Sequence, residues 1–409
     1  MSTLWMVNVR LEKGYIYEND QIIGTETEIC HLKMEDGKLV EITQTAPPPS
    51  ENQFDANQQL LLPSFREMHT HIDKTYYGGS WKACTPAIKG IFTRIEEEKE
   101  LLPKLLPTAQ ARAEKLIEMY LINGHTHIRT HCNIDPVIGL KNLEATVNAL
   151  EKYEDVLTYE IVAFPQHGLL RSDSVQLVRD AVKNGATLVG GVDPATVDRD
   201  IEKSLSTIFD IAVDNNQGVD IHLHDPGTLG AFTMERIAHY TNEAGMQGKA
   251  TISHALALGD LQGDALSELS AMLKEQAIDV TSTVPINRPT ISIPALDQFG
   301  IPVSLGHDSI TDHWSPLGTG NTIQKLGTLA ERFRMIDEAS LSSALKYATG
   351  GVTPLNEQGE RVWPKVGDEA TMMLVNATCS AEAVARRATV ESLFFKGKKV
   401  ESKQTEANA

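Results

Sequence analysis

Histidines and aspartates follow four of the apolar segments in this sequence. They lie in HTHIDK (residues 69–74), DIHLHD (220–225), SHA (253–255) and GHD (306–308). Imidazole nitrogen and carboxylate oxygen are ligands of divalent zinc and iron, and catalytic sites of these metals keep one coordination position open for water. These segments therefore predict a catalytic metal site, provided that the fold brings them together.

Three histidines and one aspartate supply the expected ligands: His69, His71, His222 and Asp308. The first two alone are a weak signal, since residues two apart lie on one side of any extended strand. His254, taken alone, is equally well explained as a hydrogen-bonded residue at a strand end. Together, the four ligands and His254 lie at the ends of four separate predicted strands. This pattern is much more specific and favours the metal site.

A second run of histidines has the same spacing as the first pair. His125, His127 and His131 occupy alternate positions of NGHTHIRTH (123–131), together with Arg129. Side chains at alternate positions share one face of a strand, so spacing alone leaves both runs open as ligands. We favour a structural role for His125 and His127, and the role of His131 stays open between lining the pocket and filling the barrel interior.

The elements that must position these residues alternate between strand and helix. Eight apolar segments read as strands, at 59–65, 124–132, 156–164, 186–192, 218–225, 249–255, 277–284 and 301–308. Amphipathic helical segments lie at 108–123, 174–185, 200–215, 232–245 and 266–276. This alternation predicts an α/β fold with a closed (β/α)8 TIM barrel, whose active site lies at the carboxyl ends of the strands. An open doubly wound sheet is the alternative, although no GxGxxG follows the first strand.

Both ends of the chain read as short strands. Residues 1–60 contain the hairpin signal EDGK (35–38), and strand patterns return at 370–378 and 388–400. We predict a small β-sandwich domain built from residues 1–60 and 355–409, beside a barrel domain of residues 61–354.

Charge and cysteine content limit the classes of function. The chain has 37 Lys and Arg against 55 Asp and Glu, a net charge of −18, which argues against a nucleic-acid groove and an anionic membrane surface. Four cysteines without a CxxC motif suit a reduced, cytoplasmic protein. No apolar run approaches the ~20 residues of a membrane span, and no signal-peptide pattern is present. We expect a cytoplasmic protein with a small-molecule substrate, and the sequence permits a homo-oligomer.

Five segments resemble the cytosine deaminase branch of the amidohydrolase superfamily. They are HTHIDK, VAFPQHG (162–168), HLHD (222–225), SHA and GHDSITDHWSPLGTGN (306–321), and the resemblance covers nearly the whole chain. GGVDPAT (190–196) and HLHDPGTLG (222–230) are still more similar to the N-isopropylammelide isopropyl amidohydrolases, triazine-pathway members of that branch. The resemblance implies a barrel with one divalent ion, Zn²⁺ or Fe²⁺, and hydrolysis of a C–N bond on a nitrogen heterocycle.

The resemblance also implies roles for single residues. It gives the same four metal ligands and places His254 beside the attacking water, while Gln166 hydrogen-bonds the heterocycle and Trp314 walls the pocket. Two positions depart from cytosine deaminase: Asp225 stands where that enzyme has a proton-carrying glutamate, and Ser309 stands where it has an acidic residue. We therefore do not expect strict cytosine specificity.

These residues permit a hydrolytic mechanism. Asp308 is placed to accept the proton of the attacking water and pass it to the departing amine, and His254 to orient the nucleophile or stabilise charge. Asp225 or His224 would protonate the ring nitrogen. Among the substrate contacts we include His224 and Ser309 with Gln166, Trp314 and Lys74, of which Lys74 either contacts a substrate carbonyl or pairs with a neighbouring carboxylate.

We predict a metal-dependent hydrolase of a C–N bond in an amino-substituted heterocycle such as a pyrimidine or triazine. The alternatives are an amidase acting on an acyclic amide or cyclic imide, and a non-catalytic binding protein on the same scaffold. Two motifs read as structural: Asp193 in GGVDPAT as a turn cap, and RIEEEKE (94–100) as a solvated helix face, part of which could form a lid.

Overall fold

The computed structural model describes residues 3–50, 52–289 and 291–401 and contains two eight-stranded sheets. One sheet is the predicted parallel barrel, in which each strand pairs with the next along the chain. Its strands are β6 (Phe65–Thr70), β7 (His125–Asn133), β8 (Thr158–Phe164), β9 (Leu188–Val192), β10 (Gly218–His222), β11 (Ala250–Ser253), β12 (Asp279–Ser282) and β13 (Val303–Leu305).

The barrel closes between its last and first strands. The Asp308 amide, just beyond β13, donates to the His69 carbonyl of β6 at 2.7 Å, and Asp308 also forms a parallel bridge with Thr70. Gly306 allows this approach, because a Cβ there would lie 2.4 Å from Cβ of His69. The seam therefore sets Asp308 directly beside the histidines of HTHIDK.

The prediction that residues 59–65 form the first barrel strand is wrong. The apolar run LLLP forms β5 (Leu60–Pro63), which pairs antiparallel with β14 (Met372–Val375) in the other sheet. The barrel instead begins with β6, FREMHT, whose buried polar residues Glu67, His69 and Thr70 hide it from a search for apolar runs. The other seven predicted segments each coincide with a barrel strand, and only β7 extends beyond its segment, by one residue.

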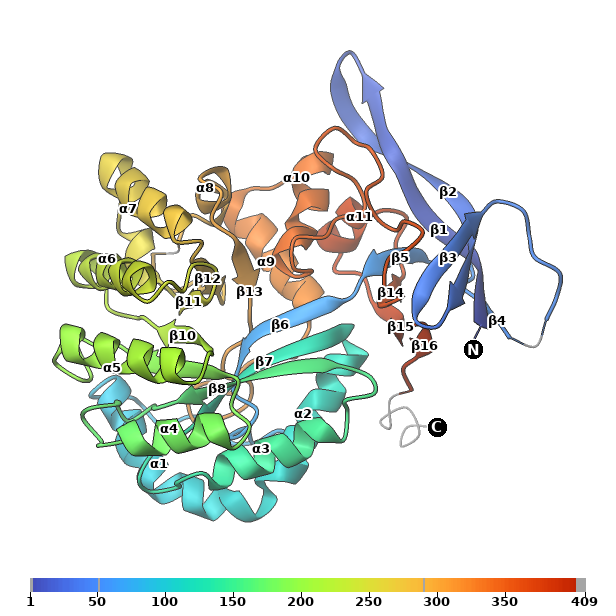
Figure 1. Ribbon diagram of the computed structural model, residues 1–409. Coiled ribbons are helices and arrows are strands. Elements are labelled where there is room, and N and C mark those ends of the chain that lie inside the picture. The colour runs from blue at the N-terminus through green and yellow to red at the C-terminus, as the bar shows by residue number, and fades with distance from the viewer. Residues whose placement is uncertain (1–2, 51, 290, 402–409) are drawn as a thin grey trace.

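Helices surround the barrel (Figure 1). The amphipathic segments form the predicted helices because they bury an apolar stripe; in α5 (Ile201–Asp214), for example, Leu205, Ile208, Phe209 and Ala212 are buried at spacings of one, three and four residues. The helices are α1 (Ile91–Leu105), α2 (Ala109–Ile122), α3 (Lys141–Glu151), α4 (Val175–Lys183), α5 (Ile201–Asp214), α6 (Gly227–Glu243), α7 (Gly263–Glu275), α8 (Ile293–Gln298), α9 (Thr322–Phe333), α10 (Glu338–Ser343) and α11 (Ser380–Ala385). Short 3₁₀ turns cover Leu106–Thr108, Leu256–Gly259 and Ala344–Tyr347.

The second sheet is built from both ends of the chain, as predicted. It contains β1 (Thr3–Glu18), β2 (Gln21–Glu35), β3 (Lys38–Thr43), β4 (Gln53–Asp55), β5, β14, β15 (Val390–Phe395) and β16 (Lys398–Lys399). In Figure 1 the blue amino-terminal strands and the red β14–β16 lie together beside the barrel. Met6, Leu32, Leu39, Met372 and Phe394 form part of their shared core. The exact domain boundaries stay a prediction.

No helix in the described part of the chain combines the length and apolarity that a bilayer crossing requires.

Candidate active site

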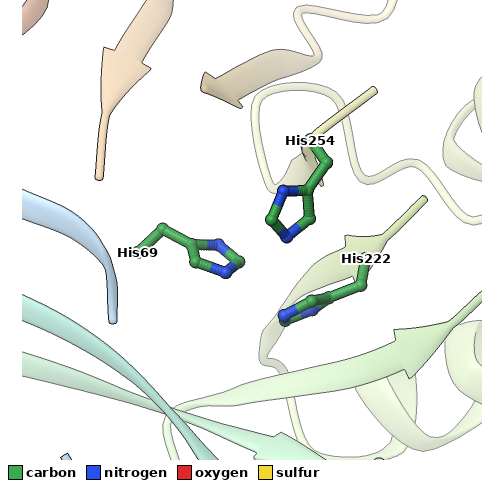
Figure 2. Close-up of side chains that lie close together, drawn as sticks. All are labelled: His69, His222 and His254. Atoms are coloured by element: carbon green, nitrogen blue, oxygen red, sulfur yellow. The ribbon is translucent and has the colours of Figure 1, made fainter. Parts of the chain in front are cut away.

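The four predicted metal ligands meet at the carboxyl end of the barrel. His69 lies in β6, His71 follows it, His222 ends β10 and Asp308 follows β13. The ring centroid of His69 is 5.5 Å from that of His71 and 4.5 Å from that of His222. Figure 2 shows the rings of His69, His222 and His254 gathered around a common centre. The fold thus brings together residues that lie up to 239 positions apart in the chain.

Hydrogen bonds fix which nitrogen of each β6 histidine faces this centre. Nδ1 of His69 lies 2.8 Å from Oγ of Ser253, which itself donates to Asp220 at 2.6 Å. Nδ1 of His71 lies 3.1 Å from the carbonyl oxygen of His131. Each Nδ1 therefore carries the proton, and each Nε2 presents a lone pair. Ligating histidines in metal sites are commonly oriented by such partners.

The chemistry of the centre fits a cation. Burial lowers the pKa of His71 to about 4, so its Nε2 is an unprotonated acceptor near neutral pH. This nitrogen nevertheless lies 3.1 Å from Oδ1 of Asp308, a second acceptor. Two electron-rich atoms at this distance repel each other unless a positive charge lies between them.

Further nitrogens around the centre lack partners. Nε2 of His69, both ring nitrogens of His222 and Nε2 of His254 are buried and have no hydrogen-bond partner among the described residues. Buried polar atoms without partners are costly, and bound metal ions are one way in which proteins satisfy them. Two overlapping groups, His69–His71–Asp308 and His69–His222–His254, have ligand atoms close enough to hold an ion.

His254 and His224 line one side of the centre with their rings in contact, tilted by 33° and 4.3 Å apart between centroids. Burial lowers the pKa of His254 well below its usual value, so its ring is neutral. Burial also disfavours charge on His224, but Asp193 outweighs burial and raises the pKa of that histidine.

Asp193 holds His224 and does not act as the predicted turn cap. It accepts hydrogen bonds from the His224 amide at 2.6 Å and lies 2.9 Å from Nδ1 of the same residue. The Asp-Pro signal is local, whereas this partner lies 31 residues away in sequence. Sequence patterns of turns carry no information about such a contact.

Asp225 lies next to this pair and is 4% exposed. Its Oδ1 accepts from the Thr196 hydroxyl, and its Oδ2 is buried without a partner in the described part of the chain. Burial raises the pKa of Asp225, although the Thr196 hydrogen bond acts in the opposite direction. A carboxyl group in this environment can hold a proton closer to neutral pH than an exposed aspartate does.

Gln166 and Lys74 contact each other beside the site. Nζ of Lys74 donates to Oε1 of Gln166 at 3.1 Å, to Oδ1 of Asn133 at 3.2 Å and to Oε1 of Glu98 at 3.3 Å. Lys74 is fully buried, and the burial penalty on its charge is outweighed by Glu98 and Asp73, which raise its pKa. Of the two roles weighed for Lys74, the ion pair is present.

Glu98 is a buried residue beside the site that the sequence did not reveal. Within RIEEEKE, read as a solvated helix face, Glu98 is 0% exposed, and that interpretation is wrong for this residue. A usable signal existed: Ile95, Glu98 and Leu102 fall at helical spacing on the buried stripe of α1, whereas Glu100 on the same helix is exposed. A carboxylate on an otherwise apolar stripe indicates a buried polar partner.

Trp314 and Ser309 lie on the segment that follows β13. Nε1 of Trp314 donates to Glu98 at 3.1 Å, and the Trp314 ring lies 5.6 Å from Nζ of Lys74. Ser309, half-buried, follows the Asp308 ligand directly. Both positions suit a pocket wall, and their contacts with substrate stay a prediction.

Two of the three histidines in the second run make structural hydrogen bonds. His125 bonds the Tyr120 carbonyl and the Thr322 hydroxyl through its two nitrogens, and His127 bonds Thr158 and Glu160. His131 is different, because neither of its nitrogens has a hydrogen-bond partner among the described residues and its ring lies 4.1 Å from that of His69. It lies against the candidate ligands inside the barrel.

Comparisons with known proteins identify the relatives of this chain. A family model described as the amidohydrolase family matches residues 123–400. The chain belongs to the amidohydrolase family. This amidohydrolase is 44% identical over 400 residues to the protein YahJ of Escherichia coli (strain K12), which covers 97% of the chain and 87% of YahJ.

Two solved structures resemble this amidohydrolase along nearly its whole length. N-isopropylammelide isopropylaminohydrolase from Burkholderia multivorans ATCC 17616 has a TM-score of 0.85 and 30% identity, covering 98% of both chains. The 5-methylcytosine deaminase from Klebsiella pneumoniae, liganded with phosphonocytosine, has a TM-score of 0.78 and 25% identity, again covering 98% of both. The resemblance to the cytosine deaminase branch and the barrel fold are confirmed.

The family also decides the class of activity. This amidohydrolase is a hydrolytic enzyme that acts on C–N bonds, as predicted, and the non-catalytic alternative is set aside. Members of the superfamily are typically metal-dependent, and the histidine and aspartate groups described above could bind a metal ion.

Proposed function

We propose that this amidohydrolase hydrolyses the C–N bond of an amino group on a nitrogen heterocycle, such as a pyrimidine or triazine, with one divalent ion, Zn²⁺ or Fe²⁺. His69, His71, His222 and Asp308 would hold the ion. The observation that carries the proposal is the approach of Nε2 of His71 to Oδ1 of Asp308 at 3.1 Å, with unpartnered imidazole nitrogens around them. A bound divalent ion would supply the nucleophile, because it lets water ionise at a pH of about 7.

Asp308 is the proposed proton carrier. A cation held by the same residues would favour the charged form of Asp308, so it begins as a carboxylate. About a third of its side chain remains exposed, which leaves room for a water molecule at the open side. It would take the proton from the attacking water and return it to the departing ammonia or alkylamine.

The other acid–base groups lie around the substrate position. Neutral His254 would accept a hydrogen bond from the nucleophile and orient it. Asp225, with its raised pKa, would donate a proton to the ring nitrogen, with His224 as the second candidate. The heterocycle would be bound by Gln166, Trp314 and Ser309. Lys74 would hold the amide oxygen of Gln166.

The relatives, like the site, support the proposed substrate class. The names of the two similar solved structures describe amine release from a triazine and from a methylated pyrimidine, both nitrogen heterocycles. Four free cysteines in the described residues are compatible with a cytoplasmic enzyme, which we retain as part of the proposal.

Metal analysis and a substrate panel test the proposal together. We expect about one zinc or iron ion per chain by mass spectrometry, and ammonia or alkylamine release from at least one amino-substituted pyrimidine or triazine. Treatment with a chelator should abolish turnover, and added Zn²⁺ or Fe²⁺ should restore it. Acyclic amides and cyclic imides belong in the same panel, since turnover of these and of no ring would favour the amidase alternative.

A further inference from the structure

We propose that Glu98 is a positioning residue for substrate specificity: through Lys74 it holds Gln166 so that the Gln166 amide nitrogen is the group left for the substrate. The pocket would then favour a ring that carries a hydrogen-bond acceptor, such as a lactam oxygen, at that edge. This inference rests on the proposed function.

Glu98 is the centre of a buried network. Its Oε1 accepts from Lys74 at 3.3 Å, from Nε1 of Trp314 at 3.1 Å and from Nε2 of His313 at 2.9 Å. Its Oε2 accepts from Nδ2 of Asn133 at 2.8 Å and from Nε2 of His167 at 3.0 Å. One carboxylate on α1 thus joins segments that follow β6, β8 and β13 with the end of β7 itself.

Lys74 transmits the position of Glu98 to Gln166. An ammonium group has three N–H donors, and those of Lys74 are matched by three acceptors: Glu98, Asn133 and Gln166. Lys74 is 0% exposed, so it depends on the Glu98 carboxylate to stay charged. Lys74 therefore has no free N–H donor left to contact the substrate directly.

The contact with Lys74 decides the orientation of the Gln166 amide. An ammonium group has no acceptor, so the atom facing Lys74 must be the amide oxygen. The structure gives the Gln166 amide nitrogen no hydrogen-bond partner among the described residues, and Gln166 is 4% exposed. The N–H₂ group is therefore the part of Gln166 available to a ligand, and it selects acceptors.

Glu98→Gln tests the inference, because glutamine keeps the shape of the side chain and removes its charge. The matched control is Glu100→Gln on the same helix, where the Glu100 side chain is 84% exposed. Crystal structures of both variants and the wild type would report the contact between Lys74 and Gln166. Kinetics would compare cytosine with 4-aminopyrimidine, which lacks the 2-oxo acceptor.

We expect Glu98→Gln to separate Lys74 from Gln166. The ratio of kcat/KM for cytosine to kcat/KM for 4-aminopyrimidine should fall about 10–100-fold, mainly because the KM for cytosine rises. Loss of a partner that supports a ligand has effects of this size in metal sites. Glu100→Gln should match the wild type. If Lys74 and Gln166 keep their contact in Glu98→Gln, or the preference is unchanged, the inference is wrong.

A second variant covers the case in which Glu98→Gln does not fold. Gln166→Glu replaces the donor by an acceptor while keeping a partner for Lys74, so it should abolish the preference for the oxo-substituted ring. A retained preference would contradict the inference. If the wild type hydrolyses no heterocycle at all, the proposed function fails, whereas the crystal structures still decide whether Glu98 positions Gln166.

Discussion

The hydroxyl of Ser253 lies 2.8 Å from Nδ1 of His69. Because this hydroxyl donates its own proton to Asp220, it can only accept from His69, and it thereby aims the Nε2 lone pair of His69 at the candidate metal centre. Asp220 is anchored in turn by Arg129 at 3.0 Å. Residues of β7, β10 and β11 thus orient His69, a candidate metal ligand.

Ser253→Ala should weaken metal binding. Without the hydroxyl, His69 loses the partner that fixes its tautomer, and we expect the affinity for Zn²⁺ to fall about 10–100-fold. Competition with a chelating indicator would measure the change. Ser267→Ala on the exposed side of α7 is the matched control and should bind as tightly as the wild type. Equal affinities for the two variants would contradict the role of Ser253.

Asp308→Asn should remove the proton carrier while keeping an oxygen that can ligate an ion. We expect kcat to fall about 10²–10⁴-fold, the usual range for loss of general acid–base assistance. Steady-state kinetics and metal analysis on the same samples would separate lost chemistry from lost metal. Asp210→Asn on the exposed face of α5 serves as the control. Full activity in Asp308→Asn would rule out the proposed mechanism.

Thr196→Val should move the pH profile of the enzyme. Burial raises the pKa of Asp225, and the Thr196 hydrogen bond lowers it. Removing this hydrogen bond should therefore raise the pKa of Asp225 further. A step that needs protonated Asp225 proceeds below this pKa and is lost as the pH rises through it. The basic limb of the kcat profile should therefore shift to higher pH. A shift to lower pH would contradict Asp225 as the acid, and Asp225→Asn should remove the limb.

Gly306→Ala should destabilise the barrel at its seam. The added Cβ would lie 2.4 Å from Cβ of His69 and 2.8 Å from its carbonyl oxygen, so backbone must move. Overpacking of this kind typically costs about 1–3 kcal/mol in the free energy of unfolding, measurable by urea denaturation. Gly24→Ala in β2 is the control, since its nearest neighbour is the Ile16 side chain at 3.8 Å. Equal stability of the two variants would argue against a tight seam.

The sequence determined the architecture, because strands and helices follow from local periodicity, and it predicted the candidate ligand set, in which the resemblance to known enzymes favoured His69 and His71 over the second histidine run. Alternating apolar and amphipathic segments predict parallel strands and covering helices. Once the strands are parallel, their carboxyl ends share one face, so His69, His222 and Asp308 are expected together despite their separation in the chain. The misplaced first strand shows the limit of this reasoning, since β6 is buried although it carries polar residues, and LLLP is buried in the other sheet.

Tertiary structure alone decided which polar residues support the site. Glu98 is surrounded by charged neighbours in sequence, and only the position of α1 against the barrel reveals that it is buried with Lys74 as its partner. The same holds for Asp193 with His224 and for Ser253 with His69. A hydrogen bond depends on two atoms meeting in space, and for residues 24 to 184 positions apart that meeting is set by the packing of elements, which local sequence patterns do not encode.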